Sequence, residues 1–157
     1  MKVSELEITK LIDKMTLVEK ASLCSGKDEW SFEAIDRLNI PSIWVSDGPH
    51  GLRKPKDSAS TGYGDQIPAT CFPTACALSS SWNRDLIQGV GTHLGIQCQA
   101  YNVHVLLGPG INIKRSPIGG RNFEYLGEDP YLAGQLAKEY ILGMQKEGIL
   151  ACAKHYV

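Results

Sequence analysis

The segment SDGPHGLR at positions 46–53 contains an aspartate, Asp47, together with an arginine, Arg53. Gly48 and Gly51 allow a tight backbone path, and the proline between them stiffens it, so Asp47 could be held in one position. A fixed carboxylate can accept hydrogen bonds from two neighbouring hydroxyl groups, such as those of a sugar ring. The same residues would equally suit an aspartate that only closes a turn.

A second polar cluster is the segment RSPIGGRNFEYLGEDP at positions 115–130, which contains arginines, acidic residues and aromatic residues. Arg121 offers forked donors that suit hydroxyl and carboxylate oxygens. Phe123 or Tyr125 could pack against the face of a sugar. A loop held together by internal ion pairs is the alternative for this segment.

The third cluster is the pair Lys154-His155, which directly follows the apolar run ILACA at positions 149–153. Two adjacent polar side chains after a buried run are costly to place unless they are paired. A solvated strand end is the alternative, and the pair alone does not decide between them.

The N-terminal part of the chain has helical patterns. Apolar residues recur at helical spacing between Ser4 and Lys14. The segment TLVE at positions 16–19 is a capping box that opens a second short helix, which we expect to end near Ser25-Gly26. A third short helix is predicted from Trp30 to Leu38. We therefore expect residues 1–40 to form a helical lead-in.

From residue 41 onward, short apolar strands alternate with amphipathic helices. We predict strands at 43–46, 103–107 and 149–153. One helix is predicted at 84–100, with Asn83 as its cap and Leu86 on its apolar face, and another at 131–146, with Asp129 as its cap. Strand, polar loop, helix and strand in this order indicate an α/β fold with a parallel sheet. Each polar cluster comes directly after a strand, where the active site lies in a (β/α)₈ TIM-type barrel.

A complete barrel of this type needs roughly 250 residues, and the chain has 157. We therefore expect residues 41–157 to be the first part of a (β/α)₈ barrel, consisting of its first few βα units and truncated at the C-terminus. The run that ends at Lys154-His155 stops directly after a strand, inside a motif.

Composition argues against several classes of function. A formal net charge of -1 gives no basic excess for binding nucleic acid. No run reaches the ~20 apolar residues of a membrane span, and the polar N-terminus has no secretory h-region, so we expect a cytoplasmic protein. Five cysteines without a CxxC pair indicate neither a disulfide framework nor a metal site. Dinucleotide, Walker, HExxH and GxSxG motifs are also missing from the sequence.

Taken in order, five motifs of this chain resemble the N-terminal part of the barrel domain of glycoside hydrolase family 3. The motifs are SDGPHGLR (46–53), FPT (72–74), LGPGIN (107–112), GRNFEYLGEDP (120–130) and AKH (153–155). The resemblance spans nearly the whole chain, and the long block around Arg121 is the most specific part of it.

This resemblance implies a sugar-binding role for residues already noted. Asp47 would accept hydrogen bonds from hydroxyls of the sugar in the -1 subsite, and the same pocket would be lined by Arg53, Arg121, Lys154 and His155. These contacts can strengthen in the transition state. The implied substrate is a small sugar or oligosaccharide, and no cofactor or metal is needed.

In the family, hydrolysis proceeds with retention, and the nucleophilic aspartate and the acid/base residue lie further along the chain than these motifs. Retention needs two carboxyl groups about 5–5.5 Å apart. We assign neither role to Asp47, Glu124 or Asp129, so we expect no catalytic residue within this chain. The rest of the barrel and a downstream domain would be needed, and the chain alone would be inactive.

The expected function is therefore a contribution to a retaining β-glycosidase that releases terminal non-reducing β-D-glucosyl residues. Two alternatives remain open at this point. The chain could be a non-catalytic carbohydrate-binding fragment, or it could belong to a β-xylosidase or an N-acetylglucosaminidase of the same family. The sequence does not predict an oligomeric state.

Overall fold

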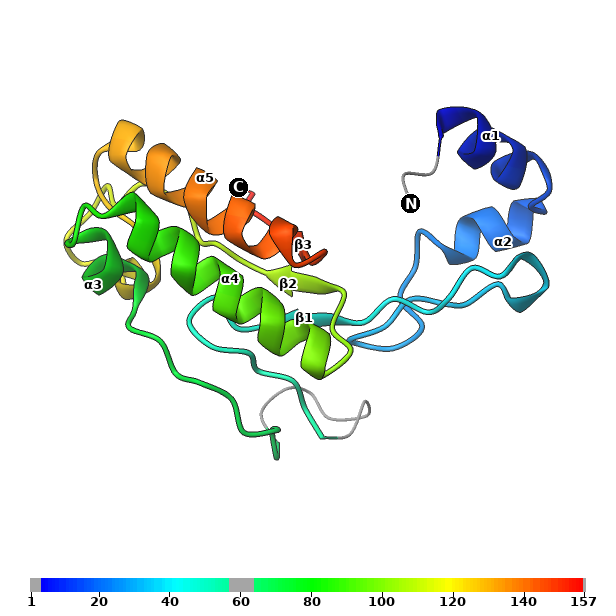
Figure 1. The fold of residues 1–157 in the computed structure, drawn as a ribbon, viewed down its shortest axis with the longest axis horizontal. Helices are drawn as coiled ribbons and strands as arrows, with labels where there is room; N and C mark the ends of the chain where they lie inside the picture. The colour runs from blue at the N-terminus through cyan, green and yellow to red at the C-terminus, as the bar shows by residue number, and fades with distance from the viewer. Residues whose placement is uncertain (1–3, 57–63, 157) are drawn as a thin grey trace. The chain divides into compact units, whose positions relative to one another are not determined.

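The computed structural model describes residues 4–56 and 64–156, and the chain divides into two compact units, Met1–Trp44 and Val45–Val157 (Figure 1). The first unit begins with two short helices, α1 (Glu5–Asp13) and α2 (Leu17–Ser22). Each starts with a capping box, in which the side chain of the N-cap residue accepts a backbone N–H and a glutamate accepts the N-cap N–H. Both helices were predicted from these local signals.

The predicted helix from Trp30 to Leu38 is wrong, and only the 3₁₀ turn η1 (Asp36–Leu38) is helical there. The carboxylate of Asp28 accepts hydrogen bonds from the backbone N–H groups of Trp30 at 2.8 Å and Ser31 at 2.7 Å. Such side-chain contacts offer the backbone an alternative to helix. Antiparallel bridges then pair Ser31 with Trp44 and Gly26 with Phe32, which extends the segment.

A parallel three-stranded sheet forms the centre of the second unit (Figure 1). Its strands are β1 (Val45–Asp47), β2 (Val105–Leu107) and β3 (Leu150–Ala151), and they lie side by side in chain order. β2 and β3 fall within predicted strands but are shorter, whereas β1 overlaps the strand predicted at 43–46 and extends one residue beyond it, to Asp47. Neighbouring parallel strands in chain order, each pair joined through a helix, are the arrangement of the first part of a (β/α)₈ barrel, as predicted.

Two long helices, α4 (Arg84–Ala100) and α5 (Pro130–Lys146), pack closely against each other and cover one face of the sheet (Figure 1). Their caps are the predicted ones, because the side chains of Asn83 and Asp129 each accept backbone N–H groups of the first turn. A shorter helix, α3 (Ala75–Ser79), precedes α4, and a 3₁₀ turn, η2 (Asn122–Glu124), lies in the loop before α5.

The core lies between the two long helices and the sheet. Its fully buried side chains include Leu94 of α4, Leu106 of β2 and Met144 of α5. Leu86, expected on the buried stripe of α4, is exposed, and the neighbouring Ile87 is buried in its place. A shift of one residue moves a side chain by about 100° around a helix, so the apolar pattern alone left this face uncertain.

The two faces of the sheet are not equally covered. Ser46 and Leu106 pair in the sheet and are completely buried. Because side chains alternate along a strand, the paired residues Val105 and Leu150 point to the other face. Leu150 is 57% exposed, so the prediction that the third strand is fully buried is wrong.

None of the helices in the described ranges is long and apolar enough to cross a membrane.

Candidate sugar-binding site

A cavity of about 530 Å³ opens beside the C-terminal ends of the strands. Side chains from separate parts of the chain line it: Asp47 and Arg53 follow β1, Arg121 begins η2, and Lys154 follows β3. These are four of the five residues that the sequence singled out. The sheet therefore brings together the three polar clusters, which lie far apart in the sequence.

Asp47 is the last residue of β1, and the turn that follows holds it in place. Gly48 and Gly51 have φ angles of 126° and 148°, which side-chain-bearing residues rarely adopt. A Cβ atom on Gly48 would lie only 2.8 Å from the backbone nitrogen of Arg53. The N–H group of Arg53 donates to the carbonyl oxygen of Asp47 at 2.9 Å. The predicted tight turn is confirmed, and only glycine fits its two special positions.

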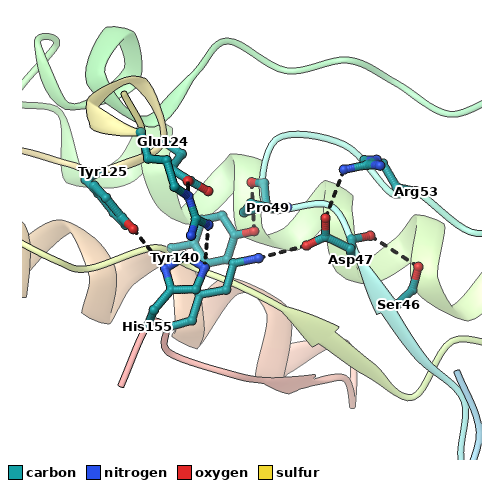
Figure 2. A network of polar contacts seen from close by, with 10 residues as sticks. Ser46, Asp47, Pro49, Arg53, Glu124, Tyr125, Tyr140 and His155 are labelled. Atoms are coloured by element: carbon teal, nitrogen blue, oxygen red, sulfur yellow. Dashed lines mark hydrogen bonds and ion pairs between the residues drawn. The ribbon is translucent and has the colours of Figure 1, made fainter. Parts of the chain in front are cut away.

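Two cations hold the carboxylate of Asp47, one on each oxygen (Figure 2). Lys154 Nζ donates to Oδ1 at 2.7 Å, and Arg53 Nη1 donates to Oδ2 at 3.0 Å. Burial is the largest single influence and raises the pKa of Asp47, but the hydrogen bond and charge of Lys154, together with the N–H of Gly48 and the charge of Arg53, hold the pKa below its ordinary value. Asp47 is therefore an ionised acceptor near neutral pH.

The loop after β2 fixes the pair Lys154-His155. The N–H group of Lys154 donates to the carbonyl of Pro109 at 3.0 Å, and its own carbonyl accepts from the N–H of Ile111 at 2.7 Å. The N–H group of His155 donates to Asn112 Oδ1 at 2.6 Å. These contacts continue the parallel pairing beyond the strand ends, so the side chain of Lys154 has a defined origin beside the cavity.

Arg121 is held by an acid on one side and a histidine on the other (Figure 2). Its Nε forms an ion pair with Glu124 Oε1, which is almost fully buried in the same turn. Its Nη2 lies 2.8 Å from His155 Nε2, and the other ring nitrogen of His155 lies 3.0 Å from the hydroxyl of Tyr125. The ion pair with Glu124 raises the pKa of Arg121.

His155 occupies a different place from the other four predicted site residues. It does not line the described cavity and instead contacts Arg121. Burial and then the positive charge of Arg121 lower the pKa of His155, which favours the neutral ring. Of the two aromatic residues expected to face a sugar, Tyr125 is buried, whereas Phe123 is half exposed and lines the cavity.

Two carboxylates that could have been taken for catalytic groups have structural partners. Glu124 lines the cavity but is paired with Arg121. Asp129 caps α5, because its two oxygens accept the N–H groups of Tyr131 and Leu132. Neither observation supports a nucleophile at these positions.

His50 and Tyr140 belong to the site but were not singled out. His50 lines the cavity, and its Nε2 accepts the backbone N–H of Ala75 at 3.0 Å. Burial lowers the pKa of His50. The hydroxyl of Tyr140, on α5, donates to the carbonyl of Pro49 at 3.0 Å (Figure 2). His50 lay inside the motif after β1, whereas Tyr140 carried only the signal of a core residue.

The arrangement can both donate and accept hydrogen bonds. It combines one ionised acceptor, Asp47, with cationic donors on Lys154, Arg53 and Arg121. Within the described ranges, no three His, Cys, Asp or Glu residues are placed to hold a metal ion.

A family model described as the glycosyl hydrolase family 3 N terminal domain matches residues 32–157. The chain is 55% identical over 152 residues to the thermostable beta-glucosidase B of Acetivibrio thermocellus, covering 96% of this chain and 20% of that protein. It is 50% identical over 147 residues to an exo-alpha-(1->6)-L-arabinopyranosidase of Bifidobacterium longum, covering 92% and 19%.

Solved structures give the same result. The GH3 beta-glucosidase of Bifidobacterium adolescentis matches with a TM-score of 0.84 and 48% identity, over 92% of this chain and 20% of that one. The beta-glucosidase of Kluyveromyces marxianus in complex with glucose matches with a TM-score of 0.89 and 42% identity, over 96% and 17%. The chain thus spans about one fifth of the length of these relatives.

Proposed function

The chain belongs to glycosyl hydrolase family 3, and we propose that it supplies the sugar-binding part of a retaining glycoside hydrolase that releases terminal β-D-glucosyl residues. The observation that carries this proposal is the carboxylate of Asp47, held between Lys154 and Arg53 in a cavity that Arg121 also lines. In this role the cavity is the -1 subsite.

Asp47 has the acceptor capacity that a sugar requires. A carboxylate has about four lone-pair positions; the two cations occupy one on each oxygen, and the backbone N–H of Gly48 also donates to the carboxylate. The remaining capacity suits a hydroxyl group of a sugar ring. Lys154 and Arg121 can then donate to sugar oxygens, and Phe123 offers an exposed ring to an apolar sugar face.

The chemical step falls to residues outside this set. An acid must be protonated at working pH, but the pKa of Asp47 is held below its ordinary value. Glu124 is committed to its ion pair with Arg121. We therefore place the nucleophilic aspartate and the acid/base residue in the remaining part of a complete barrel and a following domain, with the present residues contributing by binding the transition state.

The substrate is the finer part of the proposal. A β-glucoside is favoured because several relatives, among them the Acetivibrio thermocellus protein, are named beta-glucosidases. The relative named as an arabinopyranosidase adds an α-L-arabinopyranoside as a second candidate. A panel of aryl β-glucoside, α-L-arabinopyranoside, β-xyloside and N-acetyl-β-glucosaminide separates these substrates by kcat/KM.

The decisive experiment compares the chain alone with a graft, in which the chain replaces the corresponding segment of the Bifidobacterium adolescentis enzyme. We expect hydrolysis of aryl β-glucoside by the graft and none by the chain alone. Asp47→Ala in the graft should remove most of the activity, whereas Glu5→Ala, on an exposed face of α1, should not. Activity of the chain alone that is lost on Asp47→Ala would instead place the catalytic carboxylates here.

A further inference from the structure

The imidazole of His155 has both of its nitrogens engaged (Figure 2). Nε2 lies 2.8 Å from Arg121 Nη2, and Nδ1 lies 3.0 Å from the hydroxyl oxygen of Tyr125. A guanidinium group has five N–H donors and no acceptor. Arg121 must therefore donate to Nε2, and Nε2 cannot carry a proton.

This direction of hydrogen bonding fixes the rest of the network. A neutral imidazole with an unprotonated Nε2 carries its proton on Nδ1, which then donates to the hydroxyl oxygen of Tyr125. Arg121 sets this tautomer through Nε2, because it can only donate, whereas a tyrosine hydroxyl can donate or accept. The hydroxyl of Tyr125 is the acceptor for the Nδ1 proton.

We propose that Tyr125 is a positioning residue: by accepting the Nδ1–H hydrogen bond it fixes the orientation of the His155 ring, which in turn holds the guanidinium group of Arg121 at the cavity. The consequence for ligand binding rests on the proposed sugar-binding function, whereas the hydrogen bond itself does not. Tyr125 touches neither cavity nor ligand, because it is buried and acts through His155.

The surroundings of Tyr125 suit such a role. Its ring meets the ring of His155 edge to face, at a centroid distance of 5.8 Å and an interplanar angle of 83°. The backbone of His155 is held independently by Asn112. Tyr125 directly follows η2, the turn that contains Glu124, so the same short segment fixes both partners of Arg121.

Arg121 is then held at two of its five N–H groups, by Glu124 through Nε and by His155 through Nη2. In the part of the chain that the structure describes, its other three N–H groups have no protein acceptor and are left for ligand oxygens. A guanidinium group fixed at two points loses little additional freedom when it binds a ligand.

Protonation of His155 would break this arrangement, because an Nε2–H would face a guanidinium N–H. Arg121 and Lys154 oppose that protonation, and Glu124 and Asp47 favour it, all four being charged groups close to the ring. Burial is the largest influence and lowers the pKa of His155, so the neutral, accepting ring is the form present near neutral pH.

The test is the nitrogen NMR signature of His155 in the full chain, labelled with ¹⁵N on histidine, at neutral pH. We expect wild-type protein to show a protonated Nδ1 and an unprotonated Nε2. Tyr125→Phe removes the acceptor, so the Nδ1 proton should lose its hydrogen bond and exchange with water measurably faster, while Nε2, still bonded to Arg121, stays unprotonated. The control Tyr101→Phe removes a hydroxyl that donates to the carbonyl of Pro68 at 3.1 Å, and it should leave His155 unchanged.

Glucose titration of the same samples measures the consequence. Tyr125→Phe should weaken glucose binding about 2–12-fold, the loss of one ordinary hydrogen bond, and Tyr101→Phe should not. An Nδ1 proton of His155 that exchanges equally fast in Tyr125→Phe and in wild type overturns the role of Tyr125. Faster exchange in a protein that does not bind glucose would support that role while contradicting the proposed sugar-binding function.

A second variant tests the same idea without altering Tyr125. Arg121→Met removes the donor to Nε2 but leaves the hydroxyl of Tyr125 in place. Without Arg121, the hydroxyl of Tyr125 can accept from Nδ1–H or donate to an unprotonated Nδ1, so we expect part of the His155 population to move to the Nε2–H form. A ring that stays entirely in the Nδ1–H form would show that Nε2 is not held by Arg121 and would overturn the proposal.

Discussion

Removing Lys154 should disturb Asp47 far more than removing Arg53, although both contact the same carboxylate. The ammonium of Lys154 lies 2.7 Å from Oδ1, and its side chain is 16% exposed. Arg53 lies 3.0 Å from Oδ2, and its side chain is 50% exposed. Water screens the second pair much more than the first. Lys154→Met and Arg53→Met are therefore a matched pair of charge-removing variants.

The expected size follows from this difference in burial. A hydrogen bond to a charged group contributes about 1.5–3 kcal/mol when buried. Because the Asp47 side chain is itself 27% exposed, we expect Lys154→Met to lower the free energy of unfolding at pH 7 by about 1–2 kcal/mol. An exposed ion pair contributes about 0–1 kcal/mol, so Arg53→Met should lie near the bottom of that range.

The pH dependence of the free energy of unfolding provides a second, independent test. The pKa of Asp47 in the folded chain lies below its ordinary value of 3.8. Its stabilising contribution is therefore present above pH 3.8 and is lost as the pH falls through the folded pKa. In Lys154→Met, burial remains without its main counterweight, so the pKa of Asp47 should rise. The stability difference between Lys154→Met and wild type should shrink below pH 3.8.

Urea unfolding at pH 7 and pH 3, with a ¹³C NMR titration of the Asp47 carboxyl, measures both effects. Two results would refute the reasoning. One is an equal loss of stability in Lys154→Met and Arg53→Met at pH 7. The other is an Asp47 carboxyl whose pKa is the same in Lys154→Met and in wild type, since the lysine would then contribute nothing to the charge state.

Three further predictions test the fold and the site. Gly143→Ala should lower the free energy of unfolding, measured in urea, by about 1–3 kcal/mol, because the added Cβ would overlap the carbonyl oxygen of Gln88. In the control Gly134→Ala the added Cβ meets no atom within 4 Å, so the free energy of unfolding should rise by up to about 1 kcal/mol. The pKa of His50 lies below its ordinary value of 6.5, so the free energy of unfolding should fall as the pH drops below 6.5. His50→Gln should reduce that loss of stability between pH 7 and pH 5. An equal loss in His50→Gln and wild type would contradict the lowered pKa of His50. Arg121→Lys, which cannot contact both acceptors of the guanidinium, should weaken glucose binding about 3–10-fold by calorimetry, and unaltered affinity would count against a direct role.

Local signals in the sequence were enough to predict the helices and their caps. Asn83 and Asp129 cap the helices they were expected to cap, because capping depends on residues within one turn. The helix expected at Trp30 to Leu38 failed because antiparallel pairing with Trp44 lies outside any local pattern. The short apolar segment before Ser79 gave no indication of helix α3.

The site could be predicted as a set of residues but not as a set of contacts. Each polar cluster follows a strand, and parallel strands end at one edge, so their proximity was foreseeable. The pairing of Asp47 with Lys154 was not foreseeable, because it depends on the direction in which each side chain points at the end of its strand. For the same reason the sequence could not tell that Tyr125 turns inward while Phe123 faces the cavity.

The sheet order explains why two outer strands can share one ion pair. β2 lies between β1 and β3, so its C-terminal end separates Asp47 from Lys154. The residues there are Gly108, Pro109 and Gly110, and Gly110 forms the bridge with Lys154.

The two glycines at the end of β2 allow neighbouring loops to approach closely. A Cβ on Gly108 would lie 2.9 Å from the Pro49 side chain, and one on Gly110 would lie 2.8 Å from a backbone oxygen of the η2 turn. Without side chains at these two positions, the loops after β1 and the η2 turn can close over the end of β2, and the lysine can reach the carboxylate. The two glycines after β2 thus give the charged residues of the site room to meet, although neither glycine lines the cavity.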